Sequence, residues 1–167
     1  ISTIHKVIPY CKSLYLGFCA FLLFVGYQTT QNYQSGINET EGYISVALVY
    51  SCFGLGQFIS PMIIHFLSPK YTLFLSGICY VFYIASNTYM IIGLYFAASA
   101  ICGFGAALLW SSVGVLLSGY EQTCSTPSLC YSSFYTLYSM YFVGNFVSFI
   151  FDPSHKENMF MALTVIT

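Results

Sequence analysis

Long hydrophobic runs separated by short polar stretches are the dominant pattern of this 167-residue chain. A helix needs about 20 predominantly apolar residues to cross a bilayer. The runs that we expect to form membrane-spanning helices contain no Asp, Glu, Lys or Arg and cover residues 13–35, 43–67, 71–87, 89–119 and 131–151. A sixth run starts near residue 158 and continues to Thr167. The pattern therefore predicts one transmembrane helical domain over residues 1–167, with about five complete helices and the start of a sixth.

A transmembrane barrel would instead show segments of about ten residues with alternating polarity, and these runs do not alternate. The run at 89–119 is longer than a bilayer requires, so its helix is tilted or extends beyond the membrane. The chain begins with Ile and its sequence stops inside a hydrophobic run, so we expect a fragment of a longer protein. It shows no signal peptide, and the first span would act as its own insertion signal.

Composition supports an all-α polytopic protein of the lipid bilayer. Charged residues are 5% of the chain and hydrophobic residues 57%, whereas a soluble domain is about 25% charged. The four basic residues are all Lys, and they form no basic face of the kind that nucleic acid requires. Nucleic acid is therefore excluded as a partner.

The lysines also predict an orientation. Lys6 and Lys12 precede the first span, and Lys70 lies between the second and third. Because cytoplasmic loops are enriched in Lys and Arg, the N-terminus is expected in the cytoplasm. Lys156 falls on the opposite side and disagrees with this assignment.

Polar side chains within the spans are the candidate functional residues. Buried amides and hydroxyls are costly in a membrane and often functional. The functional interpretation is a hydrated cavity that binds a solute, and the structural alternative is that these groups join helices or lie at the interface. The candidates for a polar cavity are Gln28, Gln31, Gln57 and Asn145.

Ionisable groups are absent from the depth of every predicted span. Proton-coupled transport usually uses a titrating side chain inside the membrane, so the segment shows no proton relay. His65 lies about one turn from the end of its span and is expected at the interface. The sequence therefore gives less support to transport as a function, but this alternative stays open.

No motif predicts catalysis, a cofactor or a metal site. His5, His65 and His155 are isolated, with no His/Cys spacing typical of zinc. Gly54-Leu-Gly56 and Gly103-Phe-Gly105 resemble part of a phosphate-binding loop, but neither follows a strand. We therefore expect a protein that is not an enzyme, with no catalytic residue and no metal ligand.

Two local features concern covalent modification. Cys124 and Cys130 share a connection predicted to be cytoplasmic, where a lasting disulfide is not expected. Asn38-Glu-Thr40 matches a glycosylation acceptor on the predicted outer side, in a short loop close to the membrane.

Small residues and one proline predict how the helices pack. The run Gly103-Phe-Gly105-Ala106-Ala107-Leu-Leu-Trp110 would let two helix backbones approach closely. Pro61 removes one backbone hydrogen bond and is expected to kink or end the second helix.

Several blocks, in order, resemble the UNC-93-like family, the ion-channel-regulatory branch of the major facilitator superfamily. The resemblance covers about residues 13–151, and its most specific block is Gly103, Gly105, Ala106, Ala107 and Trp110. The other blocks are Gly26-Tyr27 with Gln31, Gln34 and Ser35; Gly42, Leu48 and Tyr50; Pro61, Leu67 and Lys70; Cys79-Tyr80 with Ser86-Asn87; Gly114; and Gly144-Asn145 with Ser148.

The chain also departs from the family pattern. The superfamily's charged loop after the second helix is reduced to His65-Phe-Leu-Ser-Pro-Lys70, without an acid or arginine, and Val113 and Leu116 replace a usual Gln and Tyr. That loop normally helps to latch the transport cycle, so its loss puts active transport in doubt.

The resemblance implies most of the N-terminal six-helix half of a twelve-helix protein. It implies a non-catalytic protein that modulates or escorts another membrane protein, such as a potassium-channel subunit. The alternatives are a secondary transporter of a neutral or organic solute by alternating access, and a purely structural membrane subunit.

Overall fold

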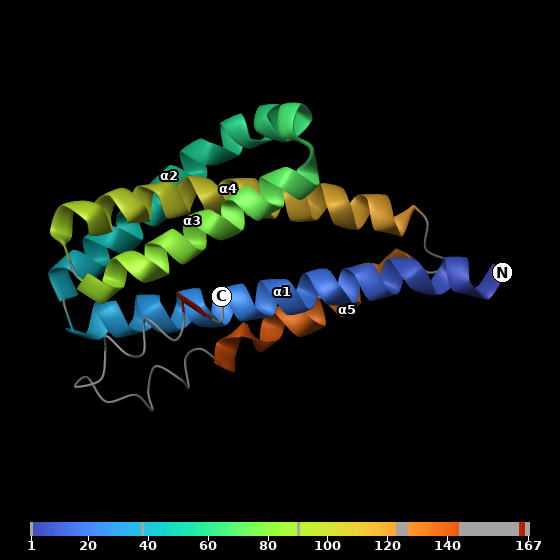
Figure 1. Ribbon diagram of the computed structural model, residues 1–167, viewed down its shortest axis with the longest axis horizontal. Coiled ribbons are helices and arrows are strands. Elements are labelled where there is room, and N and C mark those ends of the chain that lie inside the picture. The colour runs from blue at the N-terminus through green and yellow to red at the C-terminus, as the bar shows by residue number, and fades with distance from the viewer. Residues whose placement is uncertain (1, 38, 90, 123–126, 144–163, 166–167) are drawn as a thin grey trace.

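Every element of the described part of the chain is helical (Figure 1). The computed structural model describes residues 2–37, 39–89, 91–122, 127–143 and 164–165. This confirms the prediction of an all-α membrane helix bundle. The elements are α1 (Ser2–Ile37), α2 (Glu39–Leu67), α3 (Pro69–Tyr89), α4 (Ile92–Glu121), α5 (Pro127–Ser139) and the short 3-10 helix η1 (Met140–Phe142).

Three of these helices contain stretches long and apolar enough to cross a membrane, namely Ile8–Gln34, Thr40–Leu67 and Ile92–Glu121. Helix α3 has 21 residues, which corresponds to about 31 Å and matches a hydrocarbon core of about 30 Å. Residues 144–151 of the fifth predicted span and residues 158–163 lie outside the described residues. The division into five spans therefore stays a prediction.

Helix α4 packs against both α2 and α3, while α1 packs mainly against α5 (Figure 1). Two glycines of α4 explain how it can approach two neighbours at once. Gly103 and Gly105 are two positions apart, which places them about 200° apart around the helix axis. Gly103 faces α2 and Gly105 faces α3.

The contact between α4 and α2 leaves no room for a methyl group. A Cβ atom on Gly103 would lie 2.8 Å from the Cβ of Cys52 and 3.1 Å from the backbone nitrogen of Phe53, and it would also collide with the carbonyl oxygen of Val49. A Cβ on Gly56 of α2 would lie 2.8 Å from the Cβ of Ala107. Since lipid tails are as apolar as side chains, this close backbone packing is a main source of helix association in a membrane.

The contact between α1 and α5 uses the same device together with hydroxyl groups. A Cβ on Gly17 would lie 3.1 Å from the carbonyl oxygen of Phe134. One turn earlier, the hydroxyl of Ser13 donates to the carbonyl oxygen of Cys130. The hydroxyl of Ser133 donates to that of Ser13 over 3.2 Å. Small residues on α1 thus bring α5 to hydrogen-bonding distance.

The connection between α2 and α3 is a single residue, Ser68, which has a left-handed φ of 66°. Its backbone N–H donates to the carbonyl oxygen of Ile64 over 3.0 Å, as in the αL motif that ends many helices. Pro69 then starts α3. Helix α2 continues past Pro61 to Leu67, so of the two expected outcomes, a kink or an end of the helix at this proline, the second is wrong.

An aromatic cluster centred on Phe24 ties α1 to the other helices. The ring of Phe24 lies 5.5 Å from that of Tyr80 on α3, 5.6 Å from Trp110 on α4 and 5.1 Å from Tyr138 on α5, between centroids. Aromatic pairs at this separation contribute about 0.5–1.5 kcal/mol each beyond their burial. Helices α2 and α3 also carry exposed apolar side chains, as expected for contact with lipid. They include Phe58, Phe66 and Phe74.

Cys130 is disulfide-bonded, which contradicts the expectation of no lasting disulfide in the connection between the fourth and fifth spans. Its bonding partner is none of the free cysteines Cys11, Cys19, Cys52, Cys79 and Cys102. A lasting disulfide is typical of an oxidising compartment. This pairing therefore opposes the cytoplasmic placement that the lysines favour, and the orientation stays a prediction.

Candidate functional site

Gln57 lies in the interface between α2 and α4. Its side-chain oxygen accepts a hydrogen bond from the hydroxyl of Ser111 over 3.2 Å. The hydroxyls of Ser111 and Ser60 are 2.7 Å apart. A second polar link between the same helices joins the hydroxyls of Ser45 and Ser99 over 2.8 Å. These hydrogen bonds pair polar groups of α2 with polar groups of α4. Gln57 therefore links the two helices.

Gln28 lies in a different place, on the wall of a cavity of about 180 Å³ that we call the Trp110 cavity. Figure 1 shows the helices that surround it, and each of α1, α2, α4, α5 and η1 contributes to its wall. The structure thus brings together two residues singled out from the sequence, Gln28 and Trp110. The described lining residues are Phe24, Tyr27, Gln28, Val49, Tyr50, Phe53, Ala106, Trp110, Tyr138 and Tyr141.

Helical spacing explains why these residues meet. Phe24, Tyr27 and Gln28 are three and four positions apart on α1, and Ala106 and Trp110 are four positions apart on α4. Residues with this spacing share one helix face. The small side chain of Ala106 lies one turn from Trp110 on the same face, which leaves space beside the indole ring.

The rings around the Trp110 cavity pack against one another, some edge to face and some stacked. Trp110 and Tyr138 have centroids 5.1 Å apart and planes at 88°, and Phe24 and Tyr138 have planes at 86°. Tyr141 stacks on Tyr138, with centroids 4.9 Å apart. The wall therefore combines ring faces and ring edges from four elements.

Two of the other sequence candidates can be placed only in part. Gln31 is buried and hydrogen-bonds the side chain of Tyr27. Tyr27 is one of the cavity residues, so Gln31 contacts the wall without lining it. Asn145 and the glycosylation candidate Asn38 lie outside the described residues. The family block Gly103, Gly105, Ala106 and Ala107 lies on α4 next to Trp110, and its glycines make the contacts with α2 and α3 described above.

Among the described lining residues, Gln28 is the one amide, and none is Asp, Glu, Lys, Arg or His. The side-chain nitrogen of Gln28 donates to the side-chain oxygen of Asn32 over 3.3 Å. The hydroxyls of four tyrosines and the indole N–H of Trp110 complete the polar groups of these side chains. Within the described ranges, no cluster of His, Cys, Asp or Glu could hold a metal ion.

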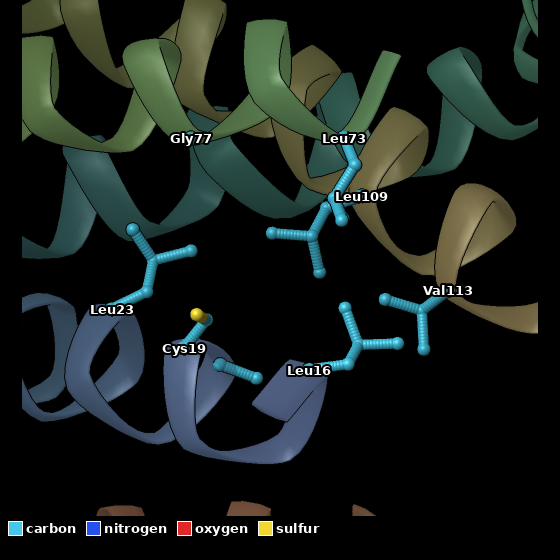
Figure 2. A pocket seen from close by; sticks show the side chains of 8 residues that line it. Leu16, Cys19, Leu23, Leu73, Gly77, Leu109 and Val113 are labelled. Carbon is cyan, nitrogen blue, oxygen red and sulfur yellow. The ribbon is translucent and has the colours of Figure 1, made fainter. Parts of the chain in front are cut away.

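A second cavity, of about 160 Å³, is apolar and lies between α1, α3 and α4 (Figure 2). Figure 2 shows Leu16 and Leu23 of α1 facing Leu109 and Val113 of α4 across this space. Its wall also includes Cys19, Ala20, Leu73 and Gly77. A cavity lined in this way offers no polar group for recognition, so the Trp110 cavity is the better candidate for a functional site.

Sequence reasoning missed most of the aromatic wall, including Tyr138 and Tyr141. A fifth of the chain is aromatic, and such residues also face lipid, so their identity alone is uninformative. The available signal was their spacing, because Phe24 and Tyr27, Tyr50 and Phe53, and Tyr138 and Tyr141 each lie three positions apart.

Comparison with known protein families gives a match over residues 33–165, to the family described as ion channel regulatory protein UNC-93. The match covers most of the chain. The chain belongs to the UNC-93 family. This confirms the resemblance inferred from the sequence blocks.

Individual relatives agree with the family assignment. The chain is 30% identical over 171 residues to the UNC93-like protein MFSD11 of Xenopus laevis, covering 91% of the chain and 38% of that relative. It is 36% identical over 109 residues to Protein unc-93 homolog A of Bos taurus, covering 63% of the chain and 24% of the relative. UNC93-like protein 3 of Arabidopsis thaliana is 25% identical over 118 residues.

The chain thus spans 38% of the length of the MFSD11 relative, and the activity of a whole UNC-93 protein is not decided by this part alone. No solved structure matches the chain significantly. The described helices and their apolar stretches, together with the family, identify an integral membrane protein.

Proposed function

We propose that the protein is a non-catalytic multi-pass membrane protein that modulates or escorts another membrane protein, such as a potassium channel. The observation that carries this proposal is the family match over residues 33–165, because that family is described as ion channel regulatory.

The chemistry of the described helices supports a regulatory role. Gln57 and the hydroxyls of Ser60 and Ser111 are engaged in joining α2 to α4, and the described parts of the predicted spans contain no Asp, Glu, Lys or Arg. Ion-coupled transporters usually place such groups within the membrane. In this part of the chain, that chemistry favours binding another membrane protein over driving a solute against its gradient.

The test is capture of partners from intact membranes that contain the full-length protein. Cells expressing a tagged protein together with potassium-channel subunits would be cross-linked before solubilisation. A channel subunit recovered with the protein, and absent with an unrelated multi-pass protein expressed at the same level, is the expected result. Recovery of no membrane protein above that control would contradict the proposal.

The second candidate is a secondary transporter of a neutral or organic solute. The Trp110 cavity favours it, since ligand sites are concave and mostly apolar with a few polar groups. Saturable uptake of a solute into vesicles containing the purified full-length protein would support transport, and a Trp110→Leu variant should lose it. Uptake with no channel capture would replace the first proposal by this one.

A further inference from the structure

We propose that the Trp110 cavity is a binding site for an organic cation with a methylated ammonium group. The inference holds whether the protein regulates a partner or carries a solute, because it concerns what the cavity recognises. It rests on the composition of the described wall and on the geometry of its rings.

Aromatic rings dominate the wall. Seven of its ten residues are aromatic, and they come from α1, α2, α4, α5 and η1. The face of each ring carries partial negative charge, so a cation within about 6 Å of a ring centroid is attracted to it, most strongly by Trp. The single Trp of the chain is one of these residues.

The aromatic rings of the wall pack against one another as one cluster. Trp110 and Phe24 each lie nearly perpendicular to Tyr138, at 88° and 86°, with centroids 5.1 Å from it, so the cluster presents rings of different orientation. Quaternary ammonium groups are bound in proteins by aromatic side chains. Tyr50, one of the wall residues, is 61% exposed in the described part of the chain.

Other classes of ligand fit the wall less well. An anion needs Lys, Arg or converging N–H donors, and none of the described lining residues is basic. A small metal cation needs several oxygen ligands, usually with carboxylates among them. A sugar carries many hydroxyl groups, and each one left unpaired against the aromatic rings of the described wall would carry a desolvation cost. A methylated ammonium has little need of hydrogen bonds, so it suits this wall.

The test uses two probes of the same shape. Choline and its uncharged carbon isostere, 3,3-dimethylbutan-1-ol, would be titrated calorimetrically into purified full-length protein. We expect choline to bind saturably and the neutral isostere to bind roughly three- to thirtyfold more weakly, which is the contribution of a cation–π contact. Equal affinity for the two probes, or no choline binding, would overturn the proposal.

Substitutions in the cavity wall test whether choline binds in this cavity. Trp110→Leu and Tyr141→Leu remove a ring but keep an apolar side chain, and each should weaken choline binding roughly three- to thirtyfold. Phe74→Leu is the matched control, because Phe74 lies on α3, is 72% exposed and does not line the cavity. It should bind choline like the unmodified protein.

Two further measurements keep the test decisive. Trp110→Phe retains a ring, so its affinity should lie between those of the unmodified protein and Trp110→Leu. Size-exclusion profiles identify a variant that has not folded, in which case the remaining ring variant decides. Unchanged choline affinity in a folded Trp110→Leu or Tyr141→Leu variant would show that the cation binds elsewhere and would refute the assignment.

Discussion

The packing of α4 against α2 predicts that Gly103→Ala is less stable than an alanine substitution at a glycine of α4 with free space around it. A methyl group at this position would lie 2.8 Å from the Cβ of Cys52 and would collide with the carbonyl oxygen of Val49. The obstacle is backbone and a Cβ atom, neither of which can rotate away. The two helices would have to move apart, or α4 would have to shift along α2.

The magnitude follows from two opposing terms. Replacing a helical glycine by alanine lowers the conformational entropy of the unfolded chain and stabilises the helix by about 0.5–1 kcal/mol. Inserting a methyl into a closely packed interface costs about 1–3 kcal/mol. Gly103→Ala should therefore be neutral to destabilising by about 2 kcal/mol.

Gly114 on the same helix provides a matched control. A Cβ at Gly114 would meet no atom within 4 Å. Gly114→Ala should therefore show only the stabilisation that alanine gives a helix relative to glycine. The two variants should then differ in unfolding free energy by the packing term alone, about 1–3 kcal/mol.

Thermal melting of the detergent-solubilised full-length protein, followed by size-exclusion chromatography of the remaining folded fraction, measures this difference. We expect Gly103→Ala to melt below Gly114→Ala by about 2 °C or more. If Gly103→Ala melted at or above Gly114→Ala, the close approach of α2 and α4 would be wrong.

Three further predictions concern the turn, a polar link and the topology. Ser68→Gly should raise the unfolding free energy by about 0.5–1 kcal/mol, since glycine adopts the left-handed φ without strain. A melting temperature below that of the unmodified protein would contradict this prediction. Ser111→Ala removes the hydroxyl bonded to Gln57 and should cost about 0.6 kcal/mol in the same melting assay; no loss would mean that the link contributes nothing. Helices α2, α3 and α4 separate Asn38 from Cys130, which lies near the start of α5, so the two residues should lie on opposite sides of the membrane. Because Cys130 is disulfide-bonded, we expect non-reducing peptide mapping to detect the disulfide and glycosidase digestion to find no glycan at Asn38; a glycan and a disulfide in one molecule would refute alternating spans.

The uncharged runs predicted an all-helical membrane protein because charge is excluded from the bilayer core irrespective of the fold. The run at 89–119 corresponds to α4, which extends from Ile92 to Glu121. Pro61 shows the limit of such local rules. A proline in a membrane helix can be tolerated when neighbouring groups satisfy the freed carbonyl, and α2 continues past this residue.

The candidate site was predictable only in part. Gln28 and Gln57 are both amides within apolar runs, yet one lines the Trp110 cavity and the other bonds Ser111. Which of these occurs depends on the residue opposite on another helix, and one sequence does not reveal that pairing. Tyr138 and Tyr141 were missed for the same reason, since an aromatic residue facing lipid and one facing a cavity have the same local sequence pattern.

The most direct test of the proposed function is an electrical recording. Potassium current would be measured in cells that express a channel alone, or together with the full-length protein, at matched channel abundance on the cell surface and in total membranes. The regulator proposal predicts a change in current or in the surface fraction of the channel when the protein is present. Identical currents and identical surface fractions, across channels that the capture experiment recovers, would contradict it.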